Sequence, residues 1–293
     1  MRKLSITESR NLDTIDIDLM DAYHIAQAIN KEDQKIAQAV KKILPQVAKA
    51  IECVADAFQK GGRLAYFGAG TSGRLGILDA SEMPPTFGVS SDMVQGFIAG
   101  GDTALRTAVE NAEDKAEFAL NDIALFAPTQ NDVIVAISAN GHPQYCITAL
   151  KQARKYGAAT IAISSNPDAR IAQLADIFIN PIVGSEVITG SSRMKSGTVQ
   201  KMILNMITTG AMIRIGKTYE NYMIDLQLTN KKLVKRGTRF ISEICHIPIK
   251  EASKYLEKAK NVKTACVMCL KQCTKEEAEA ILAQHHGILR KVI

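Results

Sequence analysis

The stretch Arg63-Leu-Ala-Tyr-Phe-Gly-Ala-Gly-Thr-Ser-Gly-Arg74 decides the fold class, because an apolar run passes through a glycine turn into a polar segment. Residues 63–67 have the pattern of a short buried strand, residues 68–73 that of a turn, and a helix is expected from about residue 74 to residue 80. The unpaired N–H groups at the start of such a helix point toward a bound anion. We therefore expect a phosphate site at this junction.

The same alternation of strand and helix continues along the chain and predicts an α/β fold with a doubly wound parallel sheet and flanking helices. The apolar runs 132–138 and 158–164 are expected at the centre of the sheet. Helical patterns precede and follow this core, including a capping box at Thr274 that predicts a small helical appendage. The other expected strands are 96–99 and 175–179, and the expected helices are 30–58, 103–121 and 143–155, with a loop at Pro84-Pro85.

Composition excludes several classes of protein. The chain has 293 residues, 46% of them apolar, which is enough for a sizeable core. It contains no apolar run long enough for a membrane span and no secretory signal, so we expect a cytoplasmic protein with free thiols. The net charge of +6 and the absence of Trp make nucleic-acid binding a weak interpretation.

The glycine turn has two readings beside that of a phosphate site. It matches the G-x-G-x-x-G pattern, with Asp92 as a candidate ribose ligand, which would indicate a dinucleotide. However, the hydroxyls of Thr71 and Ser72 and the guanidinium of Arg74 suit one compact phosphate monoester better. The third reading is a tight turn that needs glycine only for its backbone conformation.

Two further polar segments follow the same logic. Residues 138–143 leave a predicted central strand through small and polar side chains, and His142 within them is interpreted as an exposed loop residue. Residues 186–201 place hydroxyls and cations ahead of a helix, where cations are unfavourable unless an anion is near. We therefore expect both segments to face an anionic ligand.

The acidic residues and the cysteines do not identify a site by pattern alone. Glu82 precedes Pro84, and Glu110, Glu113 and Asp114 form an acidic cluster in which residues 110 and 114 share a face of the expected helix. Cys266, Cys269 and Cys273, with His285 and His286, resemble a zinc pattern, but their spacing also places the thiols on one helix face. We interpret them as buried core thiols and predict no metal.

Taken together, the longest motifs closely resemble the N-acetylmuramic acid 6-phosphate etherases. The resemblance extends from the N-terminal arm to about Arg239 and is carried by Thr7-Glu-Ser-Arg-Asn11, residues 68–88, Ile98-Ala-Gly-Gly101, residues 109–114 and residues 186–201. It implies a sugar isomerase (SIS) fold and a lyase that splits the lactyl ether of N-acetylmuramic acid 6-phosphate into N-acetylglucosamine 6-phosphate and D-lactate. It also implies a homodimer and no cofactor.

The expected domains are an N-terminal arm with helices packed on the core (1–60), a SIS phosphosugar-binding domain (61–240) and a small helical C-terminal domain (241–293).

By the same resemblance, Glu82 is the acid that protonates the departing lactate, and Glu113 is the acid/base that handles the proton on C2. Two carboxyls suit the reaction, because one must be charged to accept the C2 proton while the other is neutral to protonate a poor leaving group. The expected substrate-binding and phosphate-binding residues are Thr71, Ser72, Gly73, Arg74, Ser138, Asn140, Gly141, Glu186, Ser191, Ser192, Arg193 and Lys195.

One segment departs from the family pattern. Where the family usually has Ala-Ala-Ser-Gly-Arg-Thr-Pro-Tyr, this chain has Ser138-Ala-Asn-Gly-His-Pro-Gln-Tyr145, and Ser185 stands where the family has proline. Asn140 keeps an amide donor, but the rigid fork of an arginine is lost. Two alternatives to the etherase stay open: a phosphosugar-sensing regulator, which needs no matched acid/base pair, and an aldose–ketose isomerase.

Overall fold

The computed structural model describes residues 5–293 and divides into two compact units. The first unit combines residues up to 81 with residues 92–208, and the second combines residues 82–91 with residues 209–293. The predicted division at residues 61 and 241 stays a prediction.

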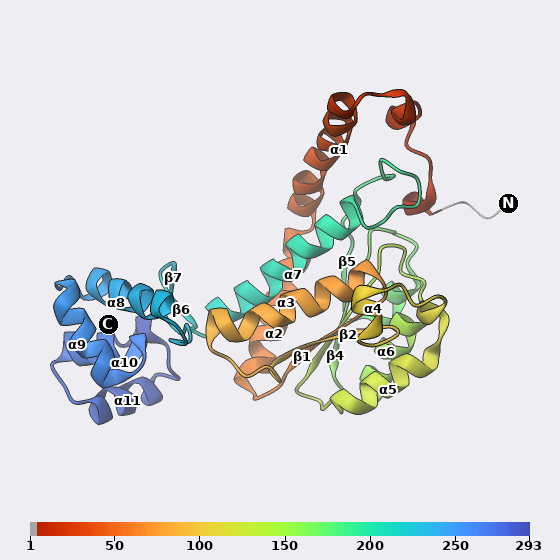
Figure 1. The fold of residues 1–293 in the computed structure, drawn as a ribbon. Helices are drawn as coiled ribbons and strands as arrows, with labels where there is room; N and C mark the ends of the chain where they lie inside the picture. Colours follow the sequence, from red (N-terminus) through yellow and green to blue (C-terminus); the bar gives the residue numbers. More distant parts are fainter. Residues whose placement is uncertain (1–4) are drawn as a thin grey trace. The chain divides into compact units, whose positions relative to one another are not determined.

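The first unit contains a five-stranded parallel sheet with the strand order β2-β1-β3-β4-β5 (Figure 1). All five predicted strands are present, and the two nearly continuous apolar runs form the interior strands β3 and β4, as expected. The strands are β1 (Leu64–Gly68), β2 (Val94–Ile98), β3 (Val133–Ile137), β4 (Ala159–Ile163) and β5 (Ile177–Ile179).

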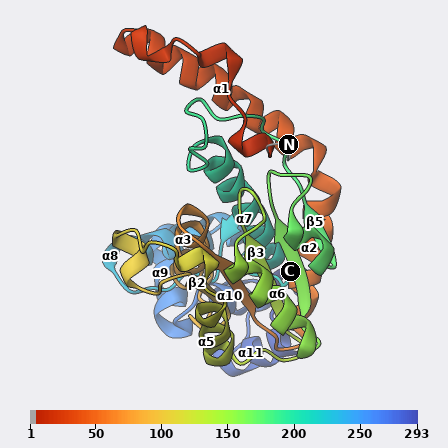
Figure 2. The same ribbon diagram turned by 90° about the vertical axis from the view of Figure 1, so that its right-hand side faces the viewer.

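Helices cover both faces of this sheet, which confirms the doubly wound architecture (Figures 1 and 2). α5 (Ala116–Phe126) and α6 (Gln144–Lys155) pack with side chains of β1 and β3 in one buried apolar cluster. On the other face lie α2 (Leu44–Gln59), α3 (Thr71–Phe87) and the first part of α7 (Lys195–Arg214). There the hydroxyl of Tyr66 donates to Asp79 of α3 at 2.9 Å, and Thr208 of α7 donates to the same carboxylate at 3.3 Å.

The expectations for three helices, over residues 30–58, 74–80 and 103–121, are wrong. The helix expected to start near residue 30 begins earlier, as α1 (Ala22–Lys42), because Asp21 accepts from the N–H of His24 as an N-cap. The pattern then breaks at Ile43, where Pro45 is suited to the first turn of α2. α3 continues through Pro84-Pro85 instead of ending before them.

The third error concerns the single helix expected over residues 103–121. The structure has α4 (Thr103–Arg106), an irregular segment, the 3₁₀ turn η4 (Ala112–Asp114) and then α5. Thr107 is extended and Asn111 adopts a left-handed conformation with φ of 59°, so residues 110 and 114 do not share a helix face.

The N-terminal arm consists of three 3₁₀ turns, η1 (Ile6–Glu8), η2 (Leu12–Thr14) and η3 (Ile17–Leu19), and leads into α1. A further 3₁₀ turn, η5 (Arg170–Leu174), precedes β5. Within the described residues, no helix is long and apolar enough to cross a membrane.

The second unit has its own core. Helices α8 (Lys231–Cys245), α9 (Ile249–Ala259), α10 (Val262–Lys271) and α11 (Lys275–Gln284) pack beside the short hairpin β6 (Thr218–Tyr219) and β7 (Tyr222–Met223), and η6 (Leu289–Lys291) follows. The predicted capping box at Thr274 is present at the start of α11. Cys266 and Cys269 are buried on α10, as expected, whereas Cys273 lies beyond the end of that helix and is half-buried.

Candidate functional site

The carboxyl edge of the sheet brings together the first two predicted turns. β1 and β3 are neighbours, and Gly68 at the end of β1 is paired with Ile137 at the end of β3. Residues 69–70 and 138–142 therefore leave the sheet side by side. Open parallel sheets bind their ligands at this edge.

The first turn owes part of its glycine content to close packing. A Cβ on Gly68 would lie 2.6 Å from the backbone N of Gly73, and a Cβ on Gly73 would lie 2.7 Å from the carbonyl oxygen of Gly68. In contrast, Gly70 has a φ of 54° and open space around it. The packing requirement therefore explains Gly68 and Gly73, and leaves the space beside Gly70 free for a ligand.

The side chains of the first turn partly face other elements. The Ser72 hydroxyl is buried and donates to the amide oxygen of Gln200 on α7 at 2.9 Å. The guanidinium of Arg74 donates through Nε to the carbonyl oxygen of Leu105 at 3.0 Å, whereas Thr71 is half-buried. The role of these residues as phosphate ligands stays a prediction.

The second turn is closed by hydrogen bonds between its own residues. The Ser138 hydroxyl donates to Asn140 Oδ1 at 3.2 Å, and the backbone N–H of His142 donates to the same oxygen at 3.0 Å. The N–H of Gly141 donates to Ser138 Oγ at 3.0 Å. Asn140 Nδ2 donates to no acceptor among residues 5–293, so it is a side-chain donor that this turn leaves for a ligand.

The third polar segment lies beside the first turn. A Cβ on Gly197, in the first turn of α7, would lie 3.3 Å from Cγ2 of Thr71. Ser191 and Ser192, just ahead of α7, are half-buried, and Arg193 is exposed. Segments about 120 residues apart in the sequence thus meet at one place.

Two residues of this third segment have partners inside the protein. The fully buried carboxylate of Glu186 accepts from the backbone N–H groups of Lys195 and Ser196, each at 2.9 Å. The buried ammonium of Lys195 pairs with Glu32 of α1. Cations ahead of this helix require a nearby anion, and the protein supplies it in part through Glu186 and Glu32. The assignment of Glu186 and Lys195 as substrate ligands stays a prediction.

Glu113 lines a pocket of about 290 Å³ together with residues of the glycine turn, including Gly70 and Arg74. Glu113 is exposed on η4, yet the pKa of its carboxyl is raised. The larger cause is desolvation by neighbouring atoms, and the smaller is the negative charge of Asp114. A raised pKa brings a carboxyl closer to neutrality, where it serves better as an acid or base.

Cys146 lies near this carboxyl but is not a nucleophile. Complete burial, and then the charge of Glu113, raise the pKa of the thiol to about 12. The thiol therefore stays protonated at neutral pH, and a nucleophilic cysteine needs the thiolate.

Glu82 is exposed on α3 and belongs to the second compact unit, whereas Glu113 belongs to the first. The pairing of the two in catalysis stays a prediction from the family resemblance.

Several polar residues around these turns were not expected from the sequence. Asn166, after β4, donates from Nδ2 to the carbonyl oxygen of Asn140 at 2.9 Å, and Gln200 and Glu32 hold Ser72 and Lys195. The signal for Asn166 was present, since Ser164-Ser165-Asn166 directly follows a buried strand. Gln200 and Glu32 lie inside ordinary helical patterns and carry no such signal.

Family models match most of the two units. Residues 46–154 match the model of the glucokinase regulatory protein N-terminal SIS domain, and residues 106–210 match that of the SIS domain. Residues 220–260 match the C-terminal lid domain of glucokinase regulatory protein. A crystal structure from Bacteroides fragilis, described as a phosphosugar isomerase involved in capsule formation, has a TM-score of 0.52 and 24% identity over 68% of this chain and 95% of its own. That likeness concerns the fold.

Curated relatives match nearly the whole chain. The N-acetylmuramic acid 6-phosphate etherase of Glaesserella parasuis is 50% identical over 96% of this chain and 93% of its own length. The etherase of Edwardsiella ictaluri is 50% identical over 98% of this chain and 96% of its own length. The chain therefore belongs to the N-acetylmuramic acid 6-phosphate etherase family.

Proposed function

We propose that this protein is a lyase that cleaves the D-lactyl ether of N-acetylmuramic acid 6-phosphate and releases D-lactate and N-acetylglucosamine 6-phosphate. Membership of the etherase family supports the reaction. The observation that carries it to this chain is the pocket in which Glu113, with its raised pKa, lies beside the glycine turn.

In the ring-opened sugar, the C1 aldehyde acidifies the hydrogen on C2, so a carboxylate is able to remove it. The C–O bond at C3 then breaks, and the lactate oxygen leaves with a proton supplied by an acid. Glu113 is proposed as the base at C2 and Glu82 as the acid at the lactate oxygen. Water next adds at C3 of the unsaturated aldehyde while a proton returns to C2, so the net reaction is hydrolysis of the ether without oxidation or reduction.

The phosphate is proposed to bind where the first turn meets the segment ahead of α7. The first turn contributes Thr71, Gly73 and Arg74 to this site. The segment ahead of α7 contributes Ser191, Ser192 and Arg193. Ser72 contributes through its backbone N–H, because its hydroxyl already donates to Gln200. Ser138, Asn140 and Gly141 form the adjacent turn.

We also propose that the protein acts as a cytoplasmic homodimer in the recycling of cell-wall amino sugars. Several large apolar side chains of the N-terminal arm and the start of α1 are exposed, which is consistent with a surface that a second copy covers. These are Leu12, Ile15, Leu19 and Tyr23. Sedimentation of the purified protein tests this point, and a monomer at micromolar concentration would contradict it.

The reaction is tested by incubating the protein with N-acetylmuramic acid 6-phosphate and measuring D-lactate. Glu113→Gln and Glu82→Gln are each expected to lower kcat by about two to four orders of magnitude, the usual contribution of a general acid or base. Glu117→Gln, an exposed carboxyl in the first turn of α5, is the matched control and is expected to keep wild-type activity. Absence of lactate together with retained binding of N-acetylglucosamine 6-phosphate would instead support the phosphosugar-sensing regulator.

A further inference from the structure

The ammonium of Lys195, only 1% exposed, is held by a residue far away in the sequence. It pairs with Oε2 of Glu32, whose side chain is 2% exposed, and Oε1 of the same carboxylate accepts from Lys35 at 2.5 Å. Burial acts to raise the pKa of Glu32, but hydrogen bonds from Lys195 and Lys35 outweigh it and lower the pKa. Glu32 is therefore charged at neutral pH and ties α1 to the first residue of α7.

The N-terminal arm makes two more contacts with the segment that leads into α7. The buried hydroxyl of Thr14 donates to the carbonyl oxygen of Val187 at 2.9 Å. Asn11 Nδ2 donates to the carbonyl oxygen of Ser185 at 3.5 Å. Residues 185, 187 and 195 bracket Ser191 and Ser192, so the arm and α1 hold this segment at both ends.

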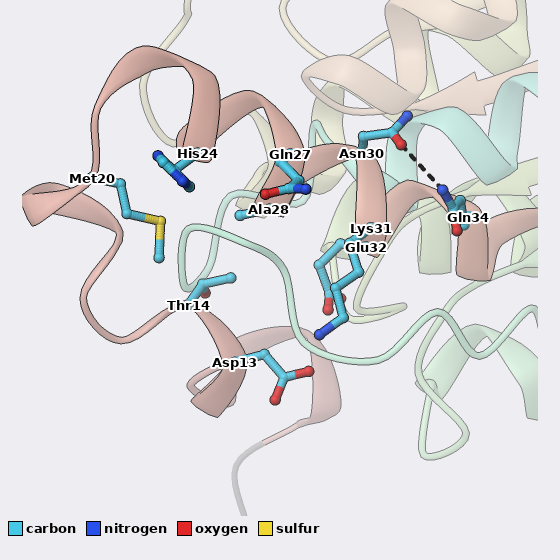
Figure 3. Close-up of a pocket in the computed structure, with 10 residues that line it drawn as sticks. All are labelled: Asp13, Thr14, Met20, His24, Gln27, Ala28, Asn30, Lys31, Glu32 and Gln34. Carbon is cyan, nitrogen blue, oxygen red and sulfur yellow. Dashed lines mark hydrogen bonds between the residues drawn. The ribbon is translucent and has the colours of Figure 1, made fainter.

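Figure 3 shows the pocket between the N-terminal arm and α1, which is lined by Thr14 and Glu32 among others. Asp13 and Thr14 of the arm lie on one side of a pocket of about 500 Å³, and residues of α1, among them Glu32, lie on the other. Thr14 and Glu32 thus come from two elements that converge on residues 185–195.

A displacement of this segment would reach the proposed phosphate site directly. Lys195 and Ser196 begin α7, Gly197 approaches Thr71, and Gln200 accepts from Ser72. Lys195, which Glu32 holds, lies two residues before Gly197 and five residues before Gln200 on α7. The position of Ser191 and Ser192 relative to the first glycine turn therefore depends on what holds residues 185–195.

We propose that residues 11–32 position the Ser191-Ser192 segment for substrate binding, with Thr14 and Glu32 as positioning residues that act through Val187 and Lys195. This inference rests on the proposed function for its effect on substrate affinity. It goes beyond that function because it gives the arm, which contributes no proposed ligand, a defined part in affinity.

The test uses Thr14→Val, which keeps the size of the side chain and removes only the hydroxyl. Loss of one buried hydrogen bond is expected to raise KM for N-acetylmuramic acid 6-phosphate, and Kd for N-acetylglucosamine 6-phosphate, by about fivefold while kcat changes little. Thr14→Ser keeps the donor and is expected to restore both constants. Amide hydrogen exchange in peptides covering residues 183–196 is expected to be faster in Thr14→Val than in the wild type and in Thr14→Ser.

The readouts separate the two ideas. If the wild type releases no lactate, the proposed function fails, while hydrogen exchange still reports whether the arm holds the segment. The positioning role is overturned if Thr14→Val lowers the melting temperature but leaves KM, Kd and the amide exchange of residues 183–196 all unchanged. It is likewise overturned if Thr14→Ser behaves like Thr14→Val.

Discussion

Asn140 closes its turn with one end of its side-chain amide and leaves the other end for a ligand. Its Oδ1 accepts from the Ser138 hydroxyl and from the N–H of His142, which are donors that an anion in this turn would otherwise use. Because an amide is planar, fixing Oδ1 also fixes the direction of Nδ2. The turn therefore offers a ligand a neutral amide donor in place of a charged guanidinium.

Asn140→Asp tests this arrangement, because aspartate has the same shape and keeps the acceptor for Ser138 and His142 but replaces the donor with a second oxygen. KM for N-acetylmuramic acid 6-phosphate is expected to rise by about tenfold or more, with little change in melting temperature. His142→Asp adds the same charge at an exposed neighbour and keeps the backbone N–H. An equal rise of KM in both variants would show that only charge matters.

Glu113 gives a prediction about pH. Its pKa is raised by desolvation and by the charge of Asp114, and a base works only when deprotonated, so activity is lost on the acid side at a higher pH than for an ordinary carboxyl. Asp114→Asn removes the nearby negative charge and favours the charged form of Glu113. The acid limb of the kcat/KM profile is expected to move to lower pH; a shift to higher pH would contradict this account.

Among the elements, the strands, α6 and the start of α11 could be predicted from the sequence, whereas the start of α1, the end of α3 and the breaks within residues 103–121 could not. The runs 132–138 and 158–164 are largely apolar on both faces, which is typical of a parallel strand covered by helices on both sides. The break at Ile43 and the irregular segment after Arg106 interrupt patterns that look continuous. Their causes are a proline in the first turn of α2 and a left-handed Asn111, and neither changes the spacing of apolar residues.

A buried ion pair joins α1 to α7, and its contribution to the stability of the fold can be measured by urea unfolding. Glu32→Met leaves the Lys195 ammonium buried without its partner and is expected to destabilise the fold by about 3–5 kcal/mol at pH 7. The double variant Glu32→Met, Lys195→Met is expected to recover most of this loss, since both charges are removed. Lys35→Met, at a half-exposed position, is the control and should cost at most about 1 kcal/mol.

The sign of the pH dependence follows from the lowered pKa of Glu32. A carboxyl whose pKa is lower in the folded state stabilises the fold above its ordinary pKa, and that contribution is lost as the pH falls through the folded value. Acid should therefore destabilise the wild type more than the double variant. An equal acid sensitivity of the two would mean that Glu32 contributes little.

At the scale of the whole molecule, the meeting of distant segments was the part least accessible to sequence reasoning. The three polar segments were each found, because each follows a strand or precedes a helix. That Glu186 caps α7 and that Gln200 accepts from Ser72 depends on three-dimensional packing. The assembly of residues 82–91 with residues 209–293 was equally invisible in a linear pattern.

Ligand binding should stabilise the whole protein in a way that reports on the phosphate. N-acetylglucosamine 6-phosphate at one hundred times its Kd is expected to raise the free energy of unfolding by about 2.7 kcal/mol. N-acetylglucosamine, which lacks the phosphate, is expected to have little effect at the same concentration. Equal stabilisation by both sugars, measured by thermal unfolding, would contradict a site built around the phosphate.

The closed turn at Asn140 also has an evolutionary consequence. By the family resemblance, Asn140, His142 and Pro143 stand in place of a serine, an arginine and a threonine. Asn140 Oδ1 accepts a hydrogen bond from the backbone N–H of residue 142, which any residue other than proline can supply. The order of the turn therefore does not depend on the side chain at position 142, which leaves that position open to exchange without loss of the closing hydrogen bond.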